Sequence, residues 1–217
     1  MYVAIVDYGM GNLFSVMRAC EFAGLKPVVT AKRTEIENAD AVILPGVGAF
    51  GDAMKTLQRL ELPDVLRSAA KSGKPLVGVC LGMQLLMGES HEFGRHEGLG
   101  ILSGDVVRLD DADVKVPQVG WNQITPAAGL TSWDGTLLAG LTRGDFMYFV
   151  HSYYVRPSET GLTLATTQYG SLNFVSAIGR NNVFACQFHP ERSGTRGLLI
   201  YQNLAKLLQK TAIGATS

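Results

Sequence analysis

The chain has 217 residues, of which 47% are hydrophobic and 18% are charged, and its 19 basic residues equal its 19 acidic residues in number. A chain of this length fits one large domain, and the high apolar fraction excludes disorder as the main state. Because the charge is balanced, the chain lacks the basic excess that binds nucleic acids or anionic membranes, and we expect neither as a partner.

The cysteine pattern and the start of the chain bear on metal binding and location. The three cysteines, Cys20, Cys80 and Cys186, are odd in number and lack CxxC spacing, which argues against a disulfide framework and against a zinc site. We therefore expect no bound metal and a reducing, cytoplasmic location. The first basic residue is Arg18, so the start lacks the charged segment of a secretory signal.

The first half of the chain alternates short apolar runs with helical patterns. Residues 1–6 form an apolar run, which a glycine-containing turn separates from a helical pattern over residues 12–22. The alternation recurs twice, with apolar runs at 41–44 and 75–79 and helical patterns at 53–60 and 81–87. Because strands in such an alternation are buried on both faces, we predict an α/β fold: a mostly parallel central sheet with helices on both faces.

After residue 109 the pattern changes to short β-like runs separated by Gly, Pro, Asn and Asp. We expect three of these runs to form a mixed or antiparallel extension of the same sheet: 146–154, 161–168 and 183–188. Leucines at helical spacing predict a last helix over residues 197–209. A single domain is expected over residues 1–210, with a frayed tail over residues 211–217.

The segment Gly78-Val79-Cys80-Leu81-Gly82 lies where an apolar run meets a helical pattern. It is typical of a nucleophile elbow with Cys in place of Ser, in which small residues are needed because the nucleophile's backbone is strained and other chain segments pack closely. The helix N-terminus also favours a thiolate. A buried structural cysteine between turn glycines would produce the same segment, so a nearby base must decide between the two.

The candidate base is His189 in Gln187-Phe188-His189-Pro190-Glu191. Pro190 biases His189 toward an extended conformation, in which His189 and Glu191 project to the same side of the chain. If His189 faces Cys80, it acts as base toward the thiol and then as acid toward the leaving amine, while Glu191 orients the ring. The alternative is a strand-end histidine with local hydrogen bonds.

A second glycine-rich turn covers residues 45–51 and formally matches the G-x-G-x-x-G pattern of dinucleotide sites. That pattern belongs to the first strand–helix turn and needs an acidic residue after the next strand, where this chain predicts a helix. We therefore expect no cofactor. Instead, we interpret Gly46, Val47 and Gly48 as a backbone strip whose N–H groups form an oxyanion hole with the amide of Leu81.

With these features together, the chain resembles the class I (triad) glutamine amidotransferases, and its segments GVCLGMQ and FHPE are close to those of the family. The resemblance covers residues 3 to about 208. It implies a flavodoxin-like α/β fold. It also implies hydrolysis of the side-chain amide of L-glutamine through a γ-glutamyl thioester on Cys80, which yields glutamate and ammonia.

The resemblance further implies the residues that bind glutamine. Gln84 and Glu92 would recognise the amino-acid end of the substrate, with backbone and hydroxyl contacts from Ser152 and Tyr153. Glu92 suits this role because an ammonium group needs a carboxylate partner. Without the resemblance, Gln84 is an ordinary surface position on a helix and Glu92 is a loop charge.

Within the family, the chain is most similar to members in which the glutaminase is a separate subunit. This similarity implies a heterodimer with a (β/α)₈-barrel cyclase subunit that receives the ammonia, in histidine biosynthesis. It places four residues toward the partner or along the route between the subunits: Asn12, Trp121, Asn122 and Tyr148. The chain has Gln118 and Arg192 where the family usually has His and Lys, and both departures bear on partner contacts.

Two other interpretations stay open from the sequence. One is a glutaminase that serves a different synthase. The other is a non-catalytic or peptidase-like relative on the same scaffold, since a fold does not determine a function. The intact Cys80, His189 and Glu191 count against a non-catalytic protein, and Gln84 counts against a peptidase.

Overall fold

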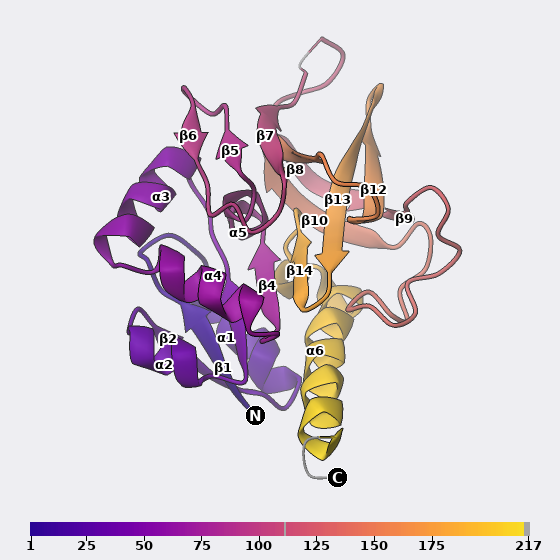
Figure 1. Ribbon diagram of the computed structural model, residues 1–217. Helices are drawn as coiled ribbons and strands as arrows, with labels where there is room; N and C mark the ends of the chain where they lie inside the picture. Colours follow the sequence, from indigo (N-terminus) through magenta and orange to yellow (C-terminus); the bar gives the residue numbers. More distant parts are fainter. Residues whose placement is uncertain (111, 215–217) are drawn as a thin grey trace.

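A mixed eight-stranded sheet forms the centre of the molecule (Figure 1) in the computed structural model, which describes residues 1–110 and 112–214. Its strands in chain order are β1 (Tyr2–Val6), β2 (Lys26–Thr30), β3 (Ala41–Leu44), β4 (Leu76–Val79), β9 (Thr125–Pro126), β12 (Thr163–Tyr169), β13 (Leu172–Arg180) and β14 (Val183–Cys186). They lie in the order β2-β1-β3-β4-β14-β13-β12-β9. The strands from β2 to β14 run parallel in a flavodoxin-like order, and β13, β12 and β9 pair antiparallel. The predicted fold class is confirmed.

Helices cover both faces of the sheet because successive residues of a buried strand point to opposite faces. The helices are α1 (Leu13–Phe22), α2 (Arg33–Asn38), α3 (Phe50–Arg59), α4 (Pro63–Lys71), α5 (Leu81–Leu85), the 3-10 turn η1 (Pro190–Arg192) and α6 (Gly194–Gly214). In β1, Val3 and Ile5 belong to the core shared with α1 and α6. Ala4 and Val6 belong to the core shared with α2, α3 and α4.

Two smaller sheets lie beside the central one. The first has the order β11-β7-β5-β6, with β5 (Glu89–Ser90), β6 (His96–Glu97), β7 (Gly104–Arg108) and β11 (Tyr153–Pro157). The second pairs β8 (Gln118–Gln123) with β10 (Phe146–His151). The prediction that residues 146–154 extend the central sheet is therefore wrong: the run breaks at Ser152, and its two parts pair in different sheets.

The last helix is longer than the leucine spacing predicts. α6 begins at Gly194 and continues to Gly214, so residues 211–214 of the expected frayed tail are helical. Residues 215–217 lie outside the described residues. Within the part of the chain that the structure describes, no helix is long and apolar enough to cross a membrane.

Candidate active site

Cys80 occupies a strained turn between β4 and α5, at the carboxyl end of a central strand. Its backbone has φ 55° and ψ −111°, and a positive φ is uncommon for a residue other than glycine. A Cβ on Gly82 would lie 1.7 Å from the carbonyl oxygen of Leu44, and a Cβ on Gly78 would lie 3.0 Å from the backbone of Gly82. The close packing therefore requires both glycines, as a nucleophile elbow does.

His189 and Glu191 follow β14, which lies next to β4 in the sheet (Figure 1). The Nδ1 atom of His189 lies 2.8 Å from Oε1 of Glu191, and both side chains are buried. The hydroxyl of Tyr201 donates to the other carboxylate oxygen of Glu191 at 3.5 Å. The Nε2 atom of His189 is buried and has no hydrogen-bond partner among the described residues, so the ring keeps one nitrogen for the nucleophile.

Opposing effects act on the protonation of His189. Burial lowers its pKa, but the interactions of the ring with the Cys80 side chain and with the carboxylate of Glu191 outweigh burial and raise the pKa to about 10. The ring is therefore an imidazolium at neutral pH, and such a neighbour favours the thiolate form of a cysteine. Sulfur, ring and carboxylate have the arrangement of a Cys-His-Glu triad.

We expect the His189 ring to stay protonated up to about pH 10, and to titrate about one pH unit or more lower in Cys80→Ala. The substitution removes the largest contribution that raises the pKa, while burial remains. A pH titration of the His189 imidazole NMR signals measures the pKa in both proteins. Equal titration in both proteins would contradict the pairing.

The same shift links His189 to stability. Its pKa in the folded chain lies above the ordinary value of 6.5. Protonation therefore stabilises the fold fully below about pH 6.5, and this contribution is lost as the pH rises toward 10.

A cavity of about 420 Å³ opens onto the sulfur of Cys80. It is lined by Val47, Gly48, Cys80, Leu81, Gln84, Glu92, Pro117, Val150, His151, Ser152, Tyr153 and Arg192. The structure thus brings together around one cavity the nucleophile, most of the glycine strip and all four residues expected to bind substrate. Gly46, His189 and Glu191 do not line the cavity. Gly46 and Glu191 are next in sequence to the lining residues Val47 and Arg192, and His189 interacts with the lining residue Cys80.

Sequence reasoning missed Gln187, which connects two parts of this site. Its Nε2 atom donates to the sulfur of Cys80 at 3.6 Å, and its Oε1 atom accepts from Nε2 of Gln84 at 3.0 Å. The Gln84 amide also donates to the carbonyl of Tyr153 at 3.0 Å, so only its oxygen is left for a ligand. Gln187 follows the end of β14 in bent backbone, so the local sequence pattern carries no signal for its contact with Cys80.

His151 also lines the cavity and was not expected there. Burial lowers the pKa of His151 to about 4, so its ring is neutral at pH 7. Its Nδ1 atom lies 2.9 Å from the carbonyl of Tyr153, and its Nε2 atom lies 3.0 Å from the side chain of Gln118. Gln118 is buried, so its side chain supports the wall of the cavity through His151 and does not form a surface contact.

The components of the expected oxyanion hole are present, but the amide of Leu81 is not free. It donates to the carbonyl oxygen of Gly46 at 3.3 Å, so that an oxygen of the strip faces it in place of an N–H group. The hydroxyl of Tyr8 donates to the carbonyl of Pro45 at 2.7 Å and lies 2.1 Å from where a Cβ of Gly46 would be. One end of the strip is thus fixed, while Gly48 has a φ of 111°, which suits glycine.

The residues expected toward a partner lie around η1, which packs against both α1 and β10. Trp121 is 55% exposed and meets Tyr148 edge to face, with ring centroids 6.1 Å apart. The guanidinium of Arg192 lies 4.4 Å from the ring centroid of Tyr148. Asn12 caps α1 through the amide of Ser15.

Asn122 differs from the other members of that group. Its side chain donates to the carbonyl of Gln168 at 2.9 Å. Its amide therefore holds β8 against β12.

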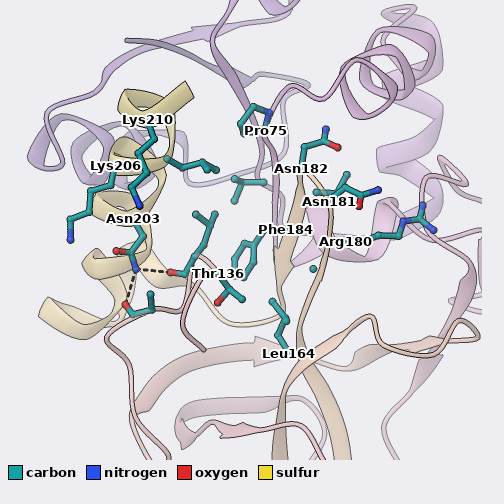
Figure 2. Close-up of a pocket in the computed structure, with 17 residues that line it drawn as sticks. Pro75, Thr136, Leu164, Arg180, Asn181, Asn182, Phe184, Asn203, Lys206 and Lys210 are labelled. Carbon is teal, nitrogen blue, oxygen red and sulfur yellow. Dashed lines mark hydrogen bonds between the residues drawn. The ribbon is translucent and has the colours of Figure 1, made fainter. Parts of the chain in front are cut away.

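A second cavity, of about 490 Å³, lies at the opposite end of the sheet. Pro75, which lines it, precedes β4, whereas Cys80 follows β4. Figure 2 shows it between α6, which carries Asn203 and Lys206, and the turn with Asn182. The described residues that line it include no cysteine, histidine or carboxylate. Ligands of open α/β sheets bind at the carboxyl ends of the strands, so the triad end is the candidate active site.

Comparisons with known proteins point to one family. A family model described as "Glutamine amidotransferase class-I" matches residues 4–206. The chain is 46% identical over 214 residues to an "Imidazole glycerol phosphate synthase subunit HisH" of Aquifex aeolicus, covering 97% of this chain and 99% of the relative. It is 47% identical over 207 residues to a protein of the same name in Moorella thermoacetica, covering 95% of each.

Solved structures show the same fold at lower identity. A crystal structure described as a glutamine amidotransferase has a TM-score of 0.72 at 20% identity, and covers 95% of this chain and 98% of its own. The structure of PurLQS from Thermotoga maritima has a TM-score of 0.73 at 17% identity, with the same coverage. At these identities the similarity supports the fold alone.

Proposed function

Because the chain belongs to the class I glutamine amidotransferases, we propose that it hydrolyses L-glutamine and delivers the ammonia for imidazole glycerol phosphate synthase, in histidine biosynthesis. The observation that carries the proposed chemistry is the position of Cys80, His189 and Glu191 at the ends of the adjacent strands β4 and β14. The name of the relatives, which match over nearly the whole chain, supports the choice of synthase.

The proposed reaction proceeds in two steps at Cys80. The thiolate attacks the side-chain carbonyl carbon of glutamine, the C–N bond breaks, and His189 gives its proton to the leaving ammonia. Water then attacks the thioester while His189 takes up a proton from it, the C–S bond breaks, and glutamate leaves. Glu191 keeps the ring oriented through its 2.8 Å contact with Nδ1.

The polar groups of the cavity support recognition of the amino-acid end of glutamine. Gln84 offers only its oxygen and Glu92 offers a carboxylate, and both suit the α-ammonium group. The chain bends at Ser152, between β10 and β11, and Ser152 and Tyr153 border the cavity, where we propose that they bind the α-carboxylate.

The relatives are named as subunits of a synthase, and the chain acts with a partner subunit. We further propose that this partner is a (β/α)₈-barrel cyclase of the HisF type, in a cytoplasmic heterodimer. Exposed aromatic side chains around η1 support a docking face there, since Phe14 on α1 is 68% exposed and Trp121 on β8 is 55% exposed. Arg192 and Asn12 border the same face, and Tyr148 would line the ammonia route.

The state of the oxyanion strip supports control by that partner. While the amide of Leu81 is bound to the carbonyl of Gly46, it cannot stabilise the negative oxygen of the tetrahedral intermediate. Rotation of a peptide in the strip Gly46–Gly48 would release that amide and turn an N–H group toward the oxygen. A partner that binds better to the rotated form would thereby switch the glutaminase on.

We expect the purified chain to hydrolyse glutamine slowly alone, and on the order of 10² to 10³ times faster with the cyclase and its nucleotide substrate, which is the effect of one oxyanion-hole donor. Glutamate release measures both rates. Hydrolysis that does not respond to this partner would point to a different synthase. No hydrolysis under any condition would point to a non-catalytic relative.

A further inference from the structure

Helix α3 begins directly after the oxyanion strip, and its first amide is held from a distant loop. The amide of Phe50 donates to Oε2 of Glu92 at 2.5 Å, across 42 residues of sequence. Ala49 has the extended backbone of an N-cap residue, with φ −86° and ψ 137°, but its methyl group cannot accept a hydrogen bond. Glu92 instead supplies an acceptor for the first amide of α3, which has no partner within the helix.

The strip is attached at both ends by side chains. At its start Tyr8 donates to the carbonyl of Pro45, and at its end Glu92 accepts from the amide of Phe50. The peptides that must present an N–H group to the reaction lie between these attachments. Gly48, with a φ of 111°, gives the chain between the two attachments a residue that can change its backbone conformation at low cost.

The carboxylate of Glu92 also reaches the substrate cavity, of which it forms part of the wall. Burial raises its pKa, while the amide of Phe50 and the charge of His96 partly oppose that rise, and Asp52 adds to it. A half-buried carboxylate with one oxygen on Phe50 retains a second oxygen for a cation.

We propose that Glu92 is a positioning residue for the oxyanion strip: the carboxylate that receives the ammonium of glutamine also anchors Phe50, so substrate binding and strip geometry are coupled through one side chain. The identity of the ammonium ligand rests on the proposed function, whereas the anchoring of Phe50 does not. Coupling of this kind is reciprocal, so an ordered strip also strengthens substrate binding.

The test compares Glu92→Gln with Glu92→Ala in the complete enzyme, with its partner and the partner's substrate. The side chain of the Glu92→Gln variant keeps an acceptor for the amide of Phe50 but loses the negative charge. We therefore expect a higher KM for glutamine and a kcat within about threefold of wild type. The Glu92→Ala variant has neither the acceptor nor the charge, so we expect KM to rise and kcat to fall by about 10- to 100-fold. Glu97→Ala, an exposed glutamate five residues further along, serves as the matched control.

A second variant separates anchoring from a general loss of structure. In Glu92→Ala combined with Ala49→Ser, the new hydroxyl can accept from the amide of Gly51 or Asp52 and stabilise the start of α3, but it cannot replace the acceptor of Phe50, so kcat should stay low. A wild-type kcat in Glu92→Ala, or full recovery of kcat in the double variant, would overturn the proposal.

Amide hydrogen exchange tests the anchor without any turnover. Exchange at Phe50 should be slow in the wild-type chain and at least about tenfold faster in Glu92→Ala. Unchanged exchange would overturn the proposal. If wild type hydrolyses no glutamine, the proposed function fails, but this measurement still decides whether Glu92 anchors the strip.

Discussion

Replacing Cys80 with alanine is expected to abolish glutamine-dependent synthesis, by about 10⁴-fold or more, while synthesis from added ammonium by the partner subunit continues. The sulfur of Cys80 is the atom that forms the thioester. Among the described residues that line the cavity, Ser152 is the one other cysteine or serine. The measurement is the rate of product formation by the complex with glutamine and, separately, with ammonium.

Cys20→Ala provides the matched control, because Cys20 is also buried but belongs to the core between α1 and the sheet. It should retain glutamine-dependent turnover. Turnover of glutamine by Cys80→Ala would identify a different nucleophile. Loss of the ammonium-dependent reaction would show instead that the substitution disturbs the complex.

Gly82→Ala is expected to have the largest effect on folding. The added Cβ would lie 1.7 Å from the carbonyl oxygen of Leu44 and 2.8 Å from its carbonyl carbon, both of which are backbone atoms of β3. Since β3 is hydrogen-bonded between β1 and β4, it cannot move away without breaking the sheet. We expect the free energy of unfolding to fall by about 4 kcal/mol or more, measured by denaturant titration.

Gly24→Ala is a suitable comparison. Gly24 has a φ of 77° but nothing within 4 Å of an added Cβ, so that only backbone strain of about 1–2 kcal/mol is expected. If Gly82→Ala were no more destabilising than Gly24→Ala, α5 and β3 would have to separate more easily than the contacts indicate.

The central strands were predictable because their burial is continuous. All four residues of β3 and all four of β4 are buried, and such runs appear in the sequence as unbroken apolar segments. Strand β2 lies at the edge of the sheet, and three of its five residues are exposed, so it carries no such pattern. Strand β8 is likewise mixed in burial and polarity.

The run at residues 146–154 shows a different limit. Its aromatic and β-branched residues predict a strand correctly, but the break at Ser152 arises because β10 pairs with β8 and β11 pairs with β7. Those pairings join segments far apart in the chain, and local pattern does not contain them.

The same distinction holds for the site. The candidate triad was predictable because it carries local signals in the sequence. Glycines surround Cys80, and Pro190 follows His189 directly. The contacts of Gln187 with Cys80 and of Glu92 with Phe50 join distant segments, at separations of 107 and 42 residues, and only the folded chain reveals them.

The adjacency of β4 and β14 also sets when the nucleophile becomes reactive during synthesis. The ribosome makes Cys80 first and His189 and Glu191 more than a hundred residues later. At about 5–20 residues per second, the cysteine spends roughly 5–20 s in a growing chain that has no imidazole to activate it. Cys80 therefore remains an ordinary thiol during synthesis. It becomes reactive only when β14, the last parallel strand, pairs with β4.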